Sequence, residues 1–428
     1  MKKLFLLFCS LTLILCAGAT HAATEIRDTE IEAGLTRLIA PLAHAADISD
    51  GRLRIHIIGN DDFNAFVTSG EDVFIYSGLL MRIRSAAALQ AVIAHEMGHM
   101  VGGHMAQMAA RMRAELMRSL IMQALGIGLM AANPMAGAGV LAGTTGMAQQ
   151  SMLSFTRDEE RLADDAAINL LTKAGLDPNG LIEVLEQMYE ITGAAEARIN
   201  PNNTNHPLTS ERLKNIKEKI GKREKTKPAG NSVNYEMLRA KLVGYLQTEQ
   251  QVENLYPSKN KSDPAVYART IRFMRSGNLE MAKTGAQTLI SREGDNPYFY
   301  ELLGDIEHQF GHYDDSVNAY EKSLKLIGAQ APQIQTALAL VLAERNKPGD
   351  ADRSIELAKR AILTEPQPLS FWVLAKAYGY DARADWARAE YYGMMKNEKE
   401  MKKYAKLARS KLPKDSPEYI KAGDLLQK

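Results

Sequence analysis

Residues 85–100 read SAAALQAVIAHEMGHM and decide the fold of the first half of this 428-residue chain. Apolar residues recur through the segment at helical spacing, and Ser85 can cap the helix that they predict. His95 and His99 stand four positions apart, so on a helix both imidazoles face one side and can bind one metal ion. Glu96 follows the first histidine, where a carboxylate can take a proton from a metal-activated water.

A catalytic zinc site needs a third protein ligand as well as one open position. His104 comes five residues after His99, which rotates it away from the face of the pair. The longer three-histidine motif wants its third histidine where this chain has Met105, and a thioether suits softer metals than zinc. Glu160 and Asp164 also stand four positions apart. The alternative that the residues favour is that Glu160 is the third ligand and that Asp164 orients a histidine ligand.

The N-terminus has the pattern of a cleaved signal peptide over residues 1–22. Lys2 and Lys3 precede an apolar run that is too short for a comfortable membrane span, and small residues follow it up to Ala22. Cleavage there removes both cysteines of the chain, Cys9 and Cys16, which excludes a disulfide framework and a cysteine nucleophile. A lipoprotein anchored at Cys16 is the alternative. The net charge of +1 argues against a nucleic-acid partner.

Elements over residues 23–220 predict one α+β domain that is mostly helical and has a small sheet. We expect helices over 25–46, 85–100, 157–174 and 179–189, and strands over 52–58, 64–68 and 72–76. The uncharged stretch 119–156 predicts a helical hairpin or lid that touches membrane or substrate. A plain pair of core helices is the alternative for that stretch.

A connector is expected over 221–262, followed by an all-α repeat domain over 263–428. Gly277 and Gly311 are 34 residues apart, and Gly349 begins a third unit after a small insertion. Small residues recur at the expected helix crossings, which is typical of tetratricopeptide repeats. Stacked helix pairs of this kind form a surface that binds peptides or partner proteins. An unrelated helical bundle is the alternative.

Five elements of the sequence carry a family resemblance: Asn64-Ala65-Phe66 with Gly70, Gly78-Leu79-Leu80, the segment from His95 to His99, the segment from Arg157 to Asp164, and His206-Pro207 with Arg212. On these elements the chain resembles the membrane- and periplasm-associated zinc metallopeptidases that include HtpX and the CAAX prenyl proteases. The predicted signal peptide and repeats make it most similar to the BepA-type periplasmic peptidases within that family. The chain departs from the membrane-embedded members because it shows no clear pair of transmembrane helices.

The resemblance implies a zincin-like fold that binds one Zn²⁺ per chain through a HExxH, gluzincin-like ligand set. By that resemblance, His95, His99 and Glu160 are the ligands and Glu96 is the catalytic base. The resemblance also implies that the strand at Asn64-Ala65-Phe66 lies at a sheet edge and pairs with extended substrate. An ordinary strand within the sheet is the alternative.

His206 lies on a loop between asparagines and Pro207. We hypothesise that His206 or Arg212 approaches the metal site, where it either stabilises the tetrahedral oxyanion or caps the zinc in a resting state. A loop histidine that caps the following helix is the alternative.

The sequence therefore predicts a periplasmic zinc endopeptidase that degrades misfolded or stalled envelope and outer-membrane proteins. Its expected partners are unfolded polypeptides and a protein that docks on the repeats, such as the outer-membrane assembly machinery. The alternative function is a chaperone-like or scaffold protein that acts through its repeats and keeps a latent peptidase site.

Overall fold

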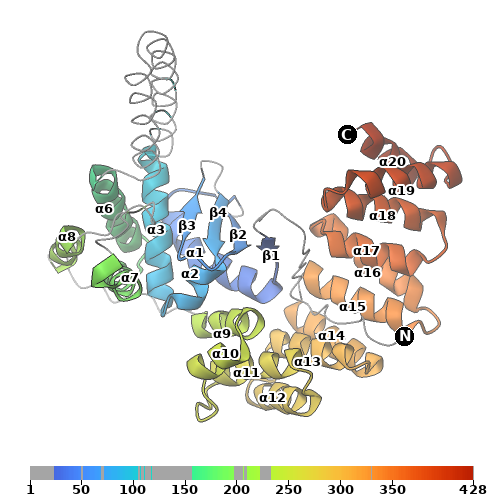
Figure 1. Cartoon of the computed structure of the whole chain (residues 1–428), viewed down its shortest axis with the longest axis horizontal. Helices are drawn as coiled ribbons and strands as arrows, with labels where there is room; N and C mark the ends of the chain where they lie inside the picture. The colour runs from blue at the N-terminus through green and yellow to red at the C-terminus, as the bar shows by residue number, and fades with distance from the viewer. Residues whose placement is uncertain are drawn as a thin grey trace, which may run out of the picture. The chain divides into compact units, whose positions relative to one another are not determined.

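The computed structural model describes residues 24–49, 52–68, 72–104, 157–196, 210–221, 233–328 and 330–427, and also residues 107, 110, 117 and 206. The predicted signal peptide and the stretch 119–156 lie outside these ranges. The chain divides into two compact units. One comprises Gly34–Glu236, and the other joins the chain up to Ala33 to Met237–Lys428. Mostly helical structure with a small sheet confirms the predicted class at this level (Figure 1).

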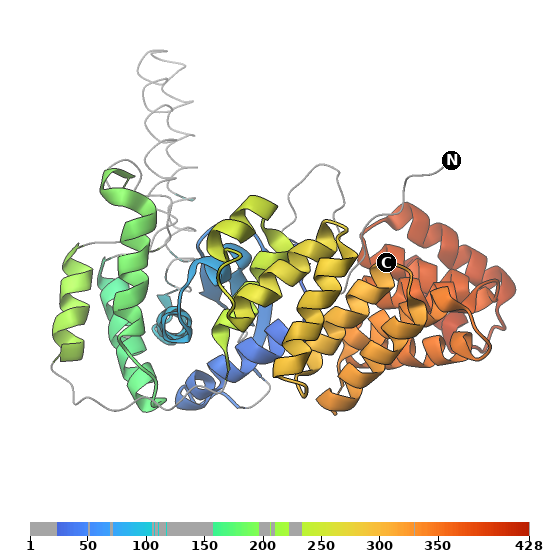
Figure 2. The same ribbon diagram turned by 90° about the horizontal axis from the view of Figure 1, so that it is seen from below.

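The unit that spans Gly34–Glu236 contains three of the described strands and the histidine-bearing helix. Its elements are most of α1 (Thr29–Ala45), β2 (Arg54–Gly59), β3 (Ala65–Val67), β4 (Asp72–Tyr76), α2 (Ser77–Arg82), α3 (Ala86–Val101), α6 (Arg157–Lys173), α7 (Gly180–Glu196) and α8 (Ser210–Gly221). α3 contacts both α6 and α7, and α7 also contacts α8 (Figures 1 and 2).

β4 lies between the other two strands of this unit. It pairs in parallel with β2 and antiparallel with β3, in which Phe66 stands opposite Phe74. Side chains alternate along β4, so Val73 and Ile75 are buried while Phe74 lies on the other face, between the rings of His56 and Phe66. β3 is at the edge of the sheet and packs against α3.

The predicted cap of α3 is confirmed. Ser85 Oγ accepts a hydrogen bond of 3.0 Å from the Ala88 N–H, and its hydroxyl donates to Glu183 of α7 at 2.6 Å. The helix is buried through most of its length, and its Gln90 amide donates to the Leu38 carbonyl oxygen of α1 at 2.7 Å. α3 is therefore a core helix, and histidines on it face protein rather than solvent.

The predicted helix over 25–46 is wrong at its beginning. Thr24–Ile26 form a short strand, β1, and α1 begins only at Thr29. Asp28 is the reason, because its Oδ1 accepts from the Ile31 N–H at 2.9 Å and so caps the helix. Pro41 lies inside α1 and does not end it.

The other unit is a succession of helices that follow one another from α9 to α20 (Figure 1). They are α9 (Tyr235–Leu246), α10 (Glu249–Leu255), α11 (Asp263–Arg275), α12 (Leu279–Arg292), α13 (Pro297–Gln309), α14 (Tyr313–Ile327), α15 (Pro332–Arg345), α16 (Asp350–Thr364), α17 (Pro368–Tyr378), α18 (Ala382–Met394), α19 (Glu398–Lys411) and α20 (Pro417–Gln427). Consecutive helices pack on each other, from α11 with α12 to α19 with α20.

Equivalent residues make equivalent contacts in successive helix pairs. Gly277 and Gly311 both have positive φ, 78° and 81°, at the turn inside a pair. Ser316 Oγ donates to the Gly304 carbonyl oxygen at 2.8 Å, and Ser354 Oγ donates to the Ala339 carbonyl oxygen at 2.7 Å. The 34-residue period in the sequence is thus a period of helix pairs in the structure.

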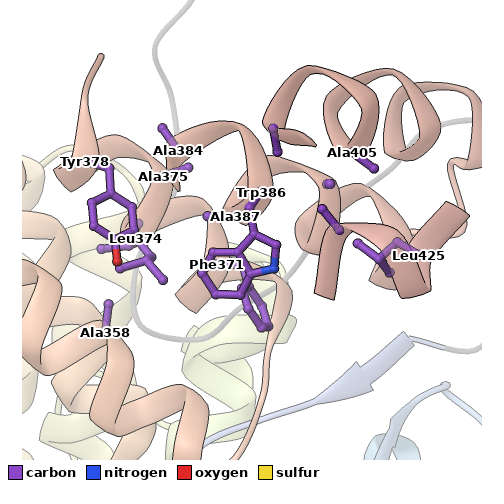
Figure 3. Packing of buried hydrophobic residues seen from close by; sticks show 14 of the residues in the cluster. Ala358, Phe371, Leu374, Ala375, Tyr378, Ala384, Trp386, Ala387, Ala405 and Leu425 are labelled. Carbon is purple, nitrogen blue, oxygen red and sulfur yellow. The ribbon is translucent and has the colours of Figure 1, made fainter. Parts of the chain in front are cut away.

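The last helices share one apolar cluster, in which Phe371 and Trp386 meet edge to face at 6.0 Å (Figure 3). At the other end of the same unit, buried charges bind the N-terminal segment. Lys241 Nζ lies 2.8 Å from Asp28 Oδ2 and 3.3 Å from Glu30 Oε2. The third carboxylate beside it is Glu301 of α13, at 3.1 Å. Within the described ranges, no helix combines the length and apolar composition of a membrane span.

Candidate metal centre

Two histidines of α3 converge as the four-residue spacing predicts. The Nε2 atoms of His95 and His99 lie 3.1 Å apart, and their rings meet edge to face with centroids 4.7 Å apart. Both side chains are almost completely buried. The pair therefore presents two imidazole nitrogens to one point inside the protein.

Glu160 of α6 brings a carboxylate to the same point. Its Oε1 lies 3.2 Å from His99 Nε2 and its Oε2 lies 3.5 Å from His95 Nε2. Gly98 makes this approach possible, because a Cβ at that position would lie 2.7 Å from the Ala163 carbonyl oxygen of α6. The missing side chain lets the two helix backbones cross closely, one turn from Glu160.

Asp164 and Arg212 contact the side chains of His95 and Glu160. Asp164 Oδ1 lies 3.0 Å from His95 Nδ1, the nitrogen on the opposite side of the ring from Glu160. The Arg212 guanidinium of α8 donates to both Asp164 oxygens, at 2.7 and 2.8 Å, and lies 2.5 Å from Glu160 Oε2. A carboxylate on the far nitrogen of a ligand histidine fixes the ring and its tautomer.

His206 also joins the group. Its Nδ1 lies 2.8 Å from Glu160 Oε1 and 3.3 Å from His95 Nε2, and its Nε2 lies 3.3 Å from Glu96 Oε1. Its neighbours 201–205 and 207–209 are outside the described residues. The structure thus places His206 among the donors.

Four residues, His95, His99, Glu160 and His206, place one ligand atom each within 4.8 Å of one another. Imidazole nitrogens and a carboxylate oxygen are the donors that zinc takes in catalytic sites. Two imidazoles, one carboxylate and a supporting partner for His95 therefore fit zinc by the chemistry of the donor set.

The pKa values of Glu96 and Glu160 shift in opposite directions. Burial raises the pKa of Glu96 above its usual value, and the charges nearby do not reverse this. Burial also acts on Glu160, but hydrogen bonds with His206, His95 and His99 outweigh it and hold the pKa of Glu160 well below its usual range. A permanently ionised Glu160 suits a ligand, and a more basic Glu96 suits a proton acceptor.

The two histidines of α3 differ as well. Burial and the Arg212 charge lower the pKa of His95, yet hydrogen bonds with Asp164 and Glu160 raise it to about 9. Burial lowers the pKa of His99 to about 4. Without a metal, the carboxylates around His95 thus favour its imidazolium form.

Two further polar residues of this region, His104 and Glu159, are buried in the structure. His104 is not among the converging donors, as expected, but it does not point away from the pair either: its Nδ1 lies 3.0 Å from His99 Nδ1. Met105, at the third position of the longer motif, lies outside the described residues. Glu159, which precedes the proposed ligand on α6, is only 5% exposed.

The segment Asn64-Ala65-Phe66 belongs to the edge of the sheet. The Asn64 carbonyl oxygen accepts from the Tyr76 N–H at 3.0 Å, and Ala65 and Phe66 lie in β3. β3 packs on α3, the helix that carries the histidines. No strand of the described residues pairs with the outer edge of β3.

Replacing Gly98 with alanine is expected to destabilise the protein by about 1–3 kcal/mol and to weaken zinc binding. The added Cβ meets α6 backbone, which has to move and carry Glu160 with it. Thermal unfolding in the presence of a chelator measures the first effect, and titration with zinc measures the second. The control is Gly221→Ala, where an added Cβ meets nothing within 4 Å. Equal zinc affinity in the Gly98 variant and in the wild type would contradict the role assigned to the close crossing.

Comparison with known proteins agrees with this geometry. Residues 29–220 match peptidase family M48. The chain is 26% identical over 306 residues to the beta-barrel assembly-enhancing protease of Escherichia coli (strain K12). The aligned residues make up 69% of this chain and 61% of that protein. It is 26% identical over 264 residues to the protein of the same name in Yersinia pestis, covering 59% of this chain and 53% of that protein.

Another relative matches a shorter part of the chain. The mitochondrial metalloendopeptidase OMA1 of Schizosaccharomyces pombe is 28% identical over 185 residues, which is 43% of this chain and 51% of that protein. The chain thus spans about three fifths of the length of the first relative, and half of the length of this one.

Proposed function

Because residues 29–220 match peptidase family M48, we propose that this protein is a zinc-dependent endopeptidase of the bacterial cell envelope. One observation supports this most strongly: His95, His99 and Glu160 converge on one point with Glu96 beside them. We assign the three converging residues as zinc ligands and Glu96 as the catalytic base. The domain is zincin-like in this proposal, and the paired helices that follow it are tetratricopeptide repeats.

The residues of the site divide the work of peptide hydrolysis. When bound, zinc supplies Lewis acidity, which polarises a carbonyl group and makes water a nucleophile at neutral pH. Glu96 accepts the proton of the attacking water and delivers it to the leaving amine nitrogen. Its raised pKa suits this task, because a weakly basic carboxylate would hold the proton too poorly.

Asp164 and Arg212 orient the site in this proposal. Arg212 binds Asp164 through two nitrogens and also neutralises Glu160, so we assign it the positioning of both carboxylates. The hypothesis that Arg212 instead reaches the oxyanion requires this guanidinium to leave its buried partners. Asp164 holds the His95 ring through Nδ1.

The edge strand β3 gives the proposed substrate a place to bind. An extended peptide can add to its outer edge through backbone hydrogen bonds, which carry little sequence preference. Such recognition suits clients that expose unfolded segments. Asn64, Ala65 and Phe66 would then contact the peptide beside α3.

The proposed function is tested by metal content and by digestion of an unfolded protein. We expect the purified protein to hold one zinc ion per chain and to cleave casein. A chelator is expected to abolish cleavage, and added zinc to restore it. Zinc binding without hydrolysis of peptide bonds would contradict the proposed endopeptidase.

A chaperone-like or scaffold function with a latent peptidase site is the alternative. The match to peptidase family M48 and the converged donors favour the enzyme. The repeats then bind a partner and do not replace the chemistry. If the loss of peptidase activity changed no phenotype that deletion of the repeats changes, the alternative would be supported.

We place the protein in the periplasm, on the signal-peptide pattern of residues 1–22. The named relatives are beta-barrel assembly-enhancing proteases, so we propose that the clients are misfolded or stalled outer-membrane proteins. The repeats would then dock on the assembly machinery. The uncharged stretch 119–156 remains a candidate for peripheral membrane contact or for a lid.

Replacing His206 with alanine tests whether this residue caps the zinc at rest. His206 contacts both Glu160 and Glu96, where water and substrate have to enter, so its removal is expected to raise the rate of peptide cleavage several-fold. Peptide hydrolysis under initial-rate conditions measures the effect. The matched control is His44→Ala, an exposed histidine at the end of α1. A lower rate would assign His206 to oxyanion stabilisation instead, and an unchanged rate would remove it from the site.

A further inference from the structure

α3 ends two residues after its second histidine, and a short turn at Gly102 and Gly103 follows. On a continuing helix, His104 would point about 140° away from His99, since each residue turns the helix by about 100°. Instead α3 ends at Val101, and Gly103 has a φ of 65°. After this turn His104 lies in the core, where it is 3% exposed and its Nδ1 lies 3.0 Å from His99 Nδ1.

Two glycines make room for this contact. A Cβ on Gly102 would lie 2.5 Å from His104 Nε2 and 2.7 Å from its Cε1, so a side chain at this position would displace the ring. Gly103 takes the left-handed conformation that other residues adopt only with strain. The two glycines are thus a second observation, beside the distance between the two nitrogens, that accounts for the position of the His104 ring.

The hydrogen bond between the rings has one direction when His99 binds a metal. His99 Nε2 faces Glu160 and His95, so its Nδ1 carries the ring proton. That N–H then donates to Nδ1 of His104, which has to accept and therefore carries its own proton on Nε2. Asp164 does the same for His95, because its Oδ1 lies 3.0 Å from His95 Nδ1.

We propose that His104 is a positioning residue that fixes the tautomer and the ring orientation of His99 for zinc. Each histidine ligand then has its own acceptor: a carboxylate from α6 for His95, and an imidazole from the turn that follows α3 for His99. The inference rests on the proposed function, since it requires His99 to be a zinc ligand.

Variants at His104 test the inference through zinc affinity rather than activity. His104→Leu removes the acceptor, while His104→Asn keeps one, because the amide oxygen of asparagine occupies about the place of Nδ1. His104 also borders an open cleft of about 500 Å³. Loss of a partner of this kind typically costs 10–100-fold in metal affinity.

We expect the zinc dissociation constant, measured by competition with a chromophoric chelator, to rise about 10–100-fold in His104→Leu. In His104→Asn it is expected to stay within about threefold of the wild type. Visible absorption of the cobalt-substituted proteins is expected to change in the same order, since it reports ligand geometry. His44→Ala is the control for loss of a histidine elsewhere.

The outcomes separate the two claims. If the wild type binds no zinc, the proposed function fails and the inference fails with it. If the wild type binds zinc and both His104 variants bind it equally well, only the inference is wrong. Equal loss in the leucine and asparagine variants also overturns it, since packing would then explain the effect. Should His104→Leu not fold, His104→Gln takes its place, because its amide oxygen lies one bond too far and is expected to cost tenfold or more.

Discussion

Replacing Glu96 with glutamine is expected to lower the rate of peptide cleavage by about a thousand-fold and to leave zinc bound. Glutamine has the size and polarity of glutamate but accepts no proton, so proton transfer from water to the leaving amine is lost. Removal of a general acid–base group costs about 10²–10⁴-fold in rate, and here one residue serves both steps. Cleavage of a fluorogenic peptide and the zinc content of the same sample check both halves of the expectation.

The matched control for this variant is Glu186→Gln. Glu186 lies in the same unit, its side chain is 51% exposed, and its ion pair with Lys217 is at the surface. Pairs of this kind contribute little to stability, so both activity and fold should survive. A Glu96→Gln protein that cleaves as fast as the wild type would rule out Glu96 as the base. The same variant should still bind any partner of the repeats, which separates catalysis from docking.

Replacing Glu160 with alanine is expected to weaken zinc binding by at least about 100-fold. Loss of a residue that only supports a ligand lowers the metal affinity about 10–100-fold, and Glu160 supplies a donor atom itself. Cleavage should fall with the zinc content and recover in part at high zinc concentration. Competition with a chelator measures the affinity.

Two further variants make this result interpretable. Asp158→Ala lies on the same helix with a side chain that is 87% exposed, so it should bind zinc as the wild type does. Glu160→Gln keeps the volume of the buried side chain, which separates the lost donor from a collapse around Arg212. If Glu160→Ala held zinc as firmly as the wild type and still digested casein, the ligand assignment would be wrong.

Local regularities made much of the fold predictable from the sequence. The spacing of His95 and His99, the cap at Ser85 and the 34-residue period each follow from the geometry of a helix or a helix pair. The start of α1 was mispredicted although its signal was present. Asp28 is a favoured capping residue, but the apolar spacing around it suggested an earlier start.

The arrangement of the candidate site does not follow from local sequence rules alone. The sequence shows that Glu160 and Asp164 are four positions apart, but their distance from the histidines depends on how α3 crosses α6. That crossing depends on one glycine, Gly98, whose role lies in a contact 65 residues away along the chain. The geometry of an ideal helix predicts that His104 points away from His99. The prediction is wrong because α3 ends at Val101, before His104.

The sequence by itself determined which residue types can bind a metal and that two of them share a helix face, because both follow from side-chain chemistry and a period of 3.6 residues. Only the tertiary structure decided which carboxylate meets them, how closely His206 approaches, and that His104 returns to His99. Those outcomes depend on helix crossings and on the places where helices end. Both are set by packing between segments that are far apart in sequence, or by glycines whose conformation a sequence pattern does not reveal.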